Sequence, residues 1–437
     1  MVNNRIFYAV KQLSAKNRLY ADNSILSDSI QFFASGAIAS GDTLIPLSGG
    51  ASGVAIEALP ATGQVITQSG EVIRYTAVSG QAGGQSGALS GVTRGFDGTQ
   101  PATISADAGE ALLKYIGWDV VHGVQSVGVT TNFSLEQVFE FGQIEIYENI
   151  EALPELEVTV ERVLDGTKPM WFMVTDETKT TLNEAVANYK ADIGLNIYSD
   201  AQNRASGTVQ QFMLMSGMFI SNATYTYPVD GNFTEAITLV GNDKTWLQSA
   251  NAPSGYWTGQ NTTDGVRNAD DEGFGSGVQR RENFDLTNTE LPTDIPGIPG
   301  VGVGNAGSGV DEHLQTVTLS VDIGREDVFE LGAKRPFIKT VTFPVEVSAT
   351  IEVVTAEGDR VEAISDNDAN LTNQNLLIKT DSGLTVDLGS ENKLLSIDFG
   401  GGDAGGGNDT VTYTYQTFNV FSISHDNPEY ARKVAAL

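Results

Sequence analysis

Short stretches in which apolar and polar residues alternate dominate the chain. In ELEVTVERVL (155–164), Leu156, Val158 and Val160 alternate with Glu155, Glu157, Thr159 and Glu161. A period of two is expected of a β-strand that buries one face and exposes the other. The pattern therefore predicts a strand with one apolar and one acidic face. Similar patterns predict strands at Ile6–Val10, Val124–Thr131 and Val138–Tyr147.

One stretch has clear helical spacing, Glu177–Asp192. Its apolar residues recur three and four positions apart and would form one stripe of a helix: Leu182, Ala185, Val186, Tyr189 and Ile193. Asp176 is predicted to be its N-cap and Gly194 to end it. A single apolar stripe predicts a scaffold helix that covers a sheet.

A long motif occurs twice. Gln125–Gly142 reads QSVGVTTNFSLEQVFEFG and Gln315–Gly332 reads QTVTLSVDIGREDVFELG. The shared motif includes Val138, Phe139 and Gly142 in the first copy and Val328, Phe329 and Gly332 in the second. After one slipped residue the acidic strand aligns with 346–354, where Glu346 and Glu352 occupy acidic positions.

The repeat continues further along the chain. ATYTY (Ala223–Tyr227) returns as VTYTY (Val411–Tyr415), and each precedes another alternating strand, Ala236–Asp243 or Val420–Asn427. Motifs repeated in the same order indicate two copies of one folding unit. The chain is therefore predicted to be a tandem duplication.

These patterns divide the chain into four parts and predict a mainly β fold. The first copy is expected at 1–21 and 117–250, interrupted at 22–116 by a small β module that is poor in charge. Residues 251–309, rich in Gly, Asn, Asp and Pro, predict a linker or an ordered arm lying on a neighbouring subunit. The second copy is expected at 310–437, with Asp359–Asn370 and the strands LLIKT and LTVDL replacing the helix. Strands predicted in the module are Thr43–Leu47, Gln64–Thr67, Glu71–Thr76 and Ala88–Thr93.

Charge and cysteine content narrow the function. The chain has 25 basic and 55 acidic residues, a net charge of −30, spread along its length. This argues against a nucleic-acid clamp, which needs a basic surface, and fits a soluble protein that repels polyanions. The absence of cysteine excludes disulfides and thiolate sites. The first twenty residues have neither the pattern of a signal peptide nor that of a membrane span.

Candidate chemistry is sparse. Gly302, Gly304 and Gly307 spell GxGxxG without the preceding strand and following helix that a phosphate cradle needs. The stretch from Asp366 to Leu377 opens like a calcium loop but has leucine where the glycine and the glutamate belong. The three histidines have no catalytic partners in the sequence pattern: His122, His313 and His425. We therefore expect no enzyme activity, no cofactor and no metal site.

Two stretches carry a resemblance to a known family. Val127–Gly166 and Phe233–Trp246 resemble the tail tube proteins of long-tailed bacteriophages. The resemblance implies a β-sandwich or barrel with a flanking helix and a long β-hairpin, forming rings that stack into the tube through which the genome passes. The inserted module, through Gly70–Thr76 and Leu89–Thr99, resembles a small β unit of virion structural proteins, which implies a place on the outside of the tube.

The resemblance and the acidic strands together predict a conduit in the tail of a virion. Glu155, Glu157, Glu161, Glu346 and Glu352 are predicted to line its lumen, since an acidic wall repels DNA; the alternative is that they face solvent on the outer wall. Implied partners are other copies of the chain, a sheath if the tail contracts, a tape measure, a baseplate hub and a terminator. DNA would pass without specific binding, and no membrane is involved.

The duplication predicts the ring. If six β units close a ring in the family, two units per chain favour a trimer with pseudo-sixfold order; a hexamer with the second copy as an outer layer is the alternative. Two other functions remain open: a hub or tail-terminator ring protein of the same fold, and a secreted β-sandwich adhesin.

Overall fold

The computed structural model confirms that the chain is mainly β. Most of its described residues lie in strands, with one short α-helix and one 3-10 turn. The described residues are 11–18, 31–34, 38–49, 63–67, 72–80, 86–96, 103, 111–115, 119–133, 135–142, 144, 146–151, 153–175, 182, 190–198, 209–248, 277–292, 313–332, 336, 338–354, 374–400 and 408–426.

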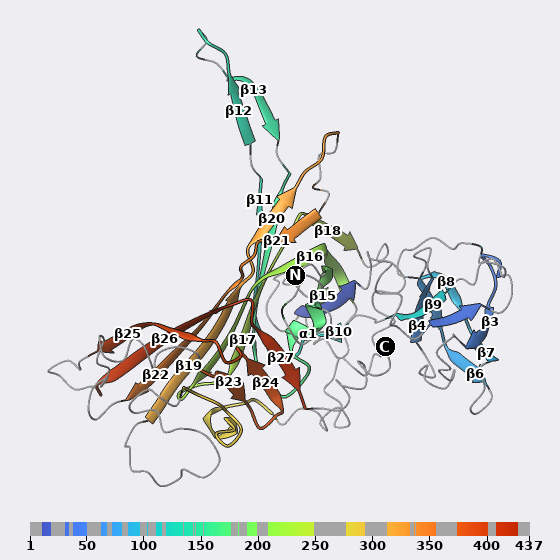
Figure 1. The fold of residues 1–437 in the computed structure, drawn as a ribbon. Helices are drawn as coiled ribbons and strands as arrows, with labels where there is room; N and C mark the ends of the chain where they lie inside the picture. The colour runs from blue at the N-terminus through green and yellow to red at the C-terminus, as the bar shows by residue number, and fades with distance from the viewer. Residues whose placement is uncertain are drawn as a thin grey trace, which may run out of the picture.

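Eight strands form one continuous antiparallel layer, the shared layer, to which both repeats contribute (Figure 1). Its order is β11 (Val124–Asn132), β14 (Glu155–Val163), β17 (Thr234–Gly241), the second half of β16 (Val209–Pro228), β19 (His313–Asp322), β22 (Glu346–Val354), β26 (Thr410–Phe418) and β25 (Lys393–Gly400). Within the described part of the chain, β11 and β25 each pair on one side only. One chain therefore forms an open sheet, so that of the predicted alternatives, a β-sandwich or a barrel, the described residues do not form a closed barrel.

A second layer covers the apolar face of the shared layer. Its first part contains β1 (Lys11–Arg18), β10 (Asp119–Val120), β15 (Lys190–Tyr198), the first half of β16 and β18 (Asp243–Gln248). Its second part contains β23 (Leu377–Lys379), β24 (Leu384–Asp387) and β27 (Ser422–His425). Buried side chains of both parts share one hydrophobic cluster with the shared layer.

Strand β16 passes from one layer to the other. Its first half pairs with β15 and β18, and its second half pairs with β17 and β19. Gly217 adopts a positive φ of 66° at the change of layer, a conformation that glycine reaches without steric cost. Its N–H donates to Asp192 Oδ1 at 2.9 Å. The long strand thus bends at one glycine and connects both sheets.

The two repeats pair their first strands in the same register. Val127 faces Val160 in the β11–β14 ladder, and Val317 faces Ile351 in the β19–β22 ladder. Each ladder is interrupted by one bulge, next to Val124 in the first and next to Leu314 in the second. These positions are equivalent in the repeated sequence, so the two copies share the β-bulge as well as the strand register.

The later part of the predicted repeat alignment is wrong. The strand that contains VTYTY, β26, pairs with β22, whereas the strand that pairs with β14 is β17 and not the ATYTY segment of β16. By position in the sheet, β26 corresponds to β17, and β25 corresponds to the second half of β16. Thr-Tyr alternation suits any central strand with one buried face, so the likeness of the two pentapeptides does not report their place in the sheet.

Two β-hairpins project from the same end of the shared layer, because β11 and β19 run in the same direction. Arm one is β12 (Leu135–Phe139) with β13 (Ile146–Glu151), and arm two is β20 (Arg325–Val328) with β21 (Ile338–Val341). Figure 1 shows arm one extending beyond the rest of the sheet. The strand expected at Val138–Tyr147 is therefore wrong, since its middle is a turn at Phe141 and Gly142.

The predicted helix is wrong where it can be checked. Ile193 and Gly194 lie in strand β15, and Leu182 is buried but not helical; Asp176, Ala185, Val186 and Tyr189 lie outside the described residues. The helix of the structure is α1 (Met170–Val174), all of whose residues are buried. This segment also fits a strand, because Ile193, Leu195 and Ile197 alternate with a period of two. Hydrogen bonding to the neighbouring strands β1 and β16 favours the strand over the helix.

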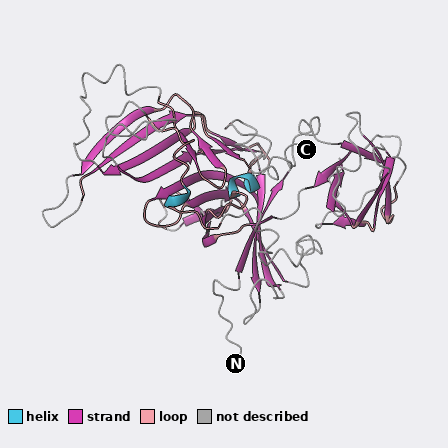
Figure 2. Cartoon of the chain, turned by 90° about the horizontal axis from the view of Figure 1, so that it is seen from below, coloured by secondary structure: helices cyan, strands magenta, loops and turns pink. Residues whose placement is uncertain are grey.

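The inserted module forms its own sheet (Figure 2). Its strands are β2 (Gln31–Ala34), β3 (Leu44–Gly49), β4 (Gly63–Thr67), β5 (Val72–Tyr75), β6 (Ala77–Gly80), β7 (Ser86–Ser90), β8 (Thr93–Phe96) and β9 (Ala111–Tyr115). Ile45, Ile73 and Leu89 are fully buried and do not belong to the main cluster. The strand expected at Ala88–Thr93 is divided at Gly91, which has a φ of 60°.

Part of the segment between the repeats packs against its own chain. Residues 277–292 include a 3-10 turn, η6 (Arg281–Asn283), and backbone hydrogen bonds between Glu290 and Leu377. Phe284 lies edge-on to Tyr227 and Phe233, with ring centroids 5.9 and 6.2 Å away. The part of the predicted linker that is described therefore lies on the same chain and joins the two repeats; the predicted strand Ile6–Val10, Asp359–Asn370 and the rest of 251–309 lie outside the described residues.

Candidate functional site

The candidate site is the exposed face of the shared layer. Along β14 the side chains alternate between exposed and buried, so that Leu156, Val158 and Val160 enter the core. The same alternation of buried and more exposed positions in β17, β22 and β26 continues this face across the layer. We call it the polar face, although it also carries Val240 and Phe418. The face is a broad surface made of short strand segments.

All five acidic residues predicted to line a lumen lie on this polar face. Glu155, Glu157 and Glu161 are exposed on β14, Glu346 is exposed on β22, and Glu352 is partly exposed on the same strand. Ser126 Oγ donates to Glu161 Oε2 at 3.3 Å across the β11–β14 ladder. The structure thus brings the acidic residues of both repeats onto one surface.

Sequence reasoning missed two further carboxylates. Asp322 faces Glu346 directly across the β19–β22 ladder, and Asp398 faces Thr412 across the β25–β26 ladder. Both are exposed. Lys393 is the one basic side chain among the described residues of this face. The alternation in β19 and β25 could have revealed both acids, but their ladder partners are far away in sequence.

Hydroxyl side chains cross the middle of the polar face in one row. Each residue of the row is the direct cross-strand neighbour of the next: Thr234, Thr226, Thr318, Thr350, Thr414 and Ser396. These side chains are short and uncharged. A face with a hydroxyl row and seven carboxylates offers no cluster of cations to hold phosphates.

The arms end in exposed apolar side chains. Phe141 and Ile144 at the tip of arm one and Leu331 at the tip of arm two are fully exposed. Gly142 and Gly332 both have a φ of 91° in the two turns. Phe139 and Phe329 of the repeated motif are also exposed, as is Val328, while Val138 is partly exposed. Apolar groups exposed at equivalent tips indicate contact surfaces for another protein.

The bases of the two arms differ. Arg325 of arm two donates from Nε and Nη2 to the Ile220 carbonyl of β16 and lies 5.2 Å from the centroid of the Phe219 ring. Burial lowers the pKa of the Arg325 guanidinium to about 9, so it is charged at neutral pH. The equivalent residue of arm one is Leu135, which is 60% exposed. Arm two is therefore anchored to the first repeat by an interaction that the described residues of arm one lack.

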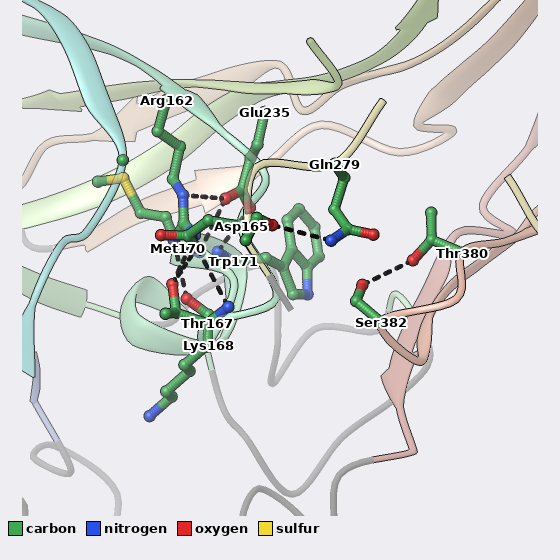
Figure 3. Close-up of polar contacts among 12 residues, drawn as sticks. Arg162, Asp165, Thr167, Lys168, Met170, Trp171, Glu235, Gln279, Thr380 and Ser382 are labelled. Carbon is green, nitrogen blue, oxygen red and sulfur yellow. Dashed lines mark hydrogen bonds and ion pairs between the residues drawn. The ribbon is translucent and has the colours of Figure 1, made fainter. Parts of the chain in front are cut away.

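A buried polar cluster fixes the chain next to α1 (Figure 3). Arg162 donates from Nη1 to the Lys168 carbonyl at 2.8 Å and from Nη2 to Asp165 and Thr167 at 3.2 and 3.0 Å. Its Nε lies 3.6 Å from Glu235 Oε2. Arg162 and Glu235 are both fully buried, so their two charges are shielded from solvent.

Glu235 also holds the start of α1. Its Oε2 accepts from the Met170 N–H at 2.9 Å, and its Oε1 accepts from the Trp171 N–H at 3.1 Å and the Tyr225 hydroxyl at 2.6 Å. Burial, together with the charge of Glu235, raises the pKa of Tyr225 well above its usual range. Arg162 Nε contacts Glu235 as an ion pair without a hydrogen bond. The other contacts of the cluster hold the start of α1, so the role of the cluster is structural.

The remaining sequence candidates do not add a site. Gly302, Gly304, Gly307 and the stretch from Asp366 to Asn370 lie outside the described residues. The residues that are described contain no group of three or more potential metal ligands and no helix long and apolar enough to cross a membrane.

Comparison with known proteins gives only distant similarity. No family model matches the chain, and no curated protein is similar to it at a significant level. Among solved structures, the tube-terminating cap of the anti-feeding prophage shares 17% identity over 30% of this chain and 84% of its own, with a TM-score of 0.24.

Two further solved structures show similarity of the same order. A chain from the sheath-tube complex of the PVC extracellular contractile injection system shares 16% identity over 30% of this chain and 82% of its own, with a TM-score of 0.23. One from the anti-feeding prophage baseplate shares 10% over 31% and 86%, with a TM-score of 0.22. Similarity at this level does not assign the chain to a family.

Proposed function

We propose that the chain is a structural subunit of a phage-tail tube, forming rings that stack around the path of the genome in the virion. The observation that carries this proposal is the shared layer itself. Both repeats join in one sheet whose apolar face is covered by other strands. Among the described residues its acidic face is uncovered, and each edge strand, β11 and β25, pairs on one side only. Such a sheet suits closure into a ring, which removes its exposed edges.

A ring of three chains has suitable dimensions. Three copies of the shared layer would give roughly 24 strands, and a spacing of about 4.8 Å with a tilt near 40° gives a barrel about 48 Å across. The lumen remains wide after side chains are added. The two repeats of each chain then supply pseudo-sixfold order from a threefold ring.

The acidic face would form the wall of the channel. Duplex DNA carries one negative charge per about 1.7 Å of its axis, so cations on the wall would bind it and slow its passage. Glu155, Glu157, Glu161, Glu346 and Glu352, together with Asp322 and Asp398, repel it instead. At physiological salt this repulsion reaches about 8 Å, which keeps the DNA away from the wall without excluding it from the channel.

The arms would join one ring to the next. They leave the same end of the layer, four strands apart, so three chains would present six arms around one rim. Their apolar tips would become buried against the adjacent ring. Where the tube ends, the arm tips would contact the hub or the terminator. A tape measure would lie inside the channel, and a sheath would contact the outside of the tube if the tail contracts.

Electron microscopy of the purified protein tests this proposal. We expect long hollow filaments whose end-on averages have threefold order within six lobes. Single rings that never stack would assign the chain to a hub or a terminator, and a monomer under all conditions that seed assembly would exclude the conduit.

A charge reversal tests the lumen. Glu157→Lys/Glu161→Lys filaments should bind and retain duplex DNA, while Glu282→Lys/Glu290→Lys filaments, with the same change of charge in the 277–292 segment, should not. Equal DNA binding by both variants would place the acidic face outside the channel.

A further inference from the structure

We propose that β25 of one protomer pairs with β11 of the next in the register that the chain already uses between β16 and β19. This inference rests on the proposed ring and names its junction residue by residue. The occupant of each open edge is thus a second copy of the chain. The internal repeat supports this pairing, because one chain contains both the contact between its two repeats, the built junction, and the open edges at which the equivalent contact, the unbuilt junction, would form.

The built junction is the contact between the two repeats. Strand β16 pairs antiparallel with β19, with Asn222 opposite Asp322, Thr224 opposite Ser320 and Thr226 opposite Thr318. The Ile323 N–H donates to the Ser221 carbonyl at 2.7 Å. The Thr224 and Ser320 hydroxyl oxygens lie 3.2 Å apart.

The strands of the unbuilt junction are equivalents of these two strands. Strand β11 corresponds to β19 through the repeated sequence and its bulge. Strand β25 corresponds to the second half of β16, because each is the second strand beyond β14 or β22. Both also carry one bulge at the matching place, with Ser221 extra in β16 and Leu395 extra in β25.

Transferring the register gives defined pairs. Ser396 is the equivalent of Asn222, and Asn132 is the equivalent of Asp322, so Ser396 should face Asn132 of the neighbouring protomer. By the same equivalence Asp398 should face Thr130, and Gly400 should face Gly128. All of these residues lie on the polar face or at its rim, so the acidic face would continue across the junction.

Burial supports the missing neighbour. At the built junction Ile220, Ala223, Val317 and Leu319 are completely buried. Their equivalents at the open edges are only partly buried against the core: Leu394, Ile397, Val127 and Val129. Both edges of one chain thus leave core side chains only partly buried, and pairing the two edges would give each of them the neighbouring strand that it lacks. Pairing would bury them at a gain of about 25 cal/mol per Å² of apolar surface.

The two junctions differ in one anchor. Arg325 joins arm two to β16 within the chain, whereas at the open edges its equivalent is Leu135 and the equivalent of Phe219 is Lys393. The junction between protomers therefore lacks the guanidinium that fastens the junction within the chain. We expect the ring to come apart between protomers before the two repeats separate.

Engineered cysteines test the register, and the absence of native cysteine leaves no competing thiol. Because Ser221 and Ile323 share a backbone hydrogen bond, the next pair, Asn222 and Asp322, is a non-hydrogen-bonded pair. Such pairs have close side chains and suit a disulfide. Their counterparts, Ser396→Cys and Asn132→Cys, should therefore cross-link neighbouring protomers when assembled particles are treated with a mild oxidant.

Two controls define the result. Thr224→Cys/Ser320→Cys at the built junction should oxidise within one chain, without any dimer on a non-reducing gel. Ser396→Cys/Thr130→Cys shifts the register by two residues and should cross-link at least tenfold less than Ser396→Cys/Asn132→Cys. Each variant is imaged under reducing conditions first, to establish that it assembles.

The possible outcomes test the β25–β11 junction and the proposed tube function separately. Covalent dimers and trimers from the in-register pair alone support the junction, and a ladder that ends at the trimer also supports three chains per ring. Rings that form without this cross-link, or that cross-link equally in the shifted register, would refute the proposed β25–β11 register but not the proposed tube function. Absence of any assembly by the unmodified chain overturns both.

Discussion

The buried pair of Arg162 and Glu235 provides a sharp test of how the first repeat is held together. In the β14–β17 ladder these two residues face each other, and at the equivalent place of the second repeat Val353 faces Val411. The same sheet position thus carries an ion pair in one repeat and two valines in the other. We predict that Arg162→Val loosens the whole segment 164–175.

The magnitude follows from the interactions of the Arg162 guanidinium. Arg162 makes three hydrogen bonds, is ion-paired with both Asp165 and Glu235, and is completely buried. Removing one partner of a buried pair typically costs about 3–5 kcal/mol, because the other charge remains without compensation. Asp165 and the Lys168 carbonyl would also lose the guanidinium as a donor. Opening of this segment should therefore become on the order of a hundred to several thousand times more frequent.

Hydrogen exchange followed by mass spectrometry measures this opening. Peptides spanning 162–175 should exchange faster in Arg162→Val, including the Met170 and Trp171 amides, which bond to Glu235 and not to Arg162. Peptides of β22 should be unchanged. Arg162→Lys keeps the charge near Glu235 but cannot reach all the other acceptors, and it should lie between the two.

The double variant Arg162→Val/Glu235→Val completes the test. It reproduces the valine pair of the second repeat, so its cost should be smaller than the sum of the two single costs by about 1–3 kcal/mol. It should still be less stable than the unmodified chain, since the Met170 and Trp171 amides and the Tyr225 hydroxyl lose their acceptor. Additive costs, or unchanged exchange in Arg162→Val, would refute the reasoning.

Three further predictions concern single features of the fold. Burial lowers the pKa of His425 to about 4, below the value of about 6.5 in an unfolded chain. The free energy of unfolding should therefore be highest above pH 6.5 and fall by up to roughly 3 kcal/mol as the pH decreases toward 4. His425→Gln should show a weaker acid dependence in urea unfolding. Gly123→Ala should lower the unfolding midpoint more than Gly142→Ala, because both glycines have positive φ but only at Gly123 would a Cβ lie 2.5 Å from a backbone oxygen; equal losses would contradict this. Phe141→Ser/Leu331→Ser should leave rings intact and shorten filaments in electron micrographs, and filaments of full length would show that the arm tips do not join rings.

The amino-acid sequence alone determined several of the strands and, within them, the side chains that face the core. In β14 the alternation of apolar and acidic residues predicted both faces, and the structure buries Leu156, Val158 and Val160 as expected. Period-two patterning is a local property, and a strand with one apolar side has one way to face a core. The repeat of 125–142 at 315–332 was readable for the same reason, since its matches lie at fixed positions along the chain.

Only the tertiary structure decided which strands became neighbours. ATYTY and VTYTY look equivalent, yet they occupy different places in the sheet, because backbone hydrogen bonding between strands does not depend on which alternating sequence supplies the edge. The segment at Ile193 fits a helical stripe as well as a strand, and its pairing with β1 and β16 selected the strand. Asp322 and Asp398 joined the acidic face through ladder partners distant in sequence. Long-range pairing, and not local pattern, thus assembled two repeats into one sheet with a single acidic face.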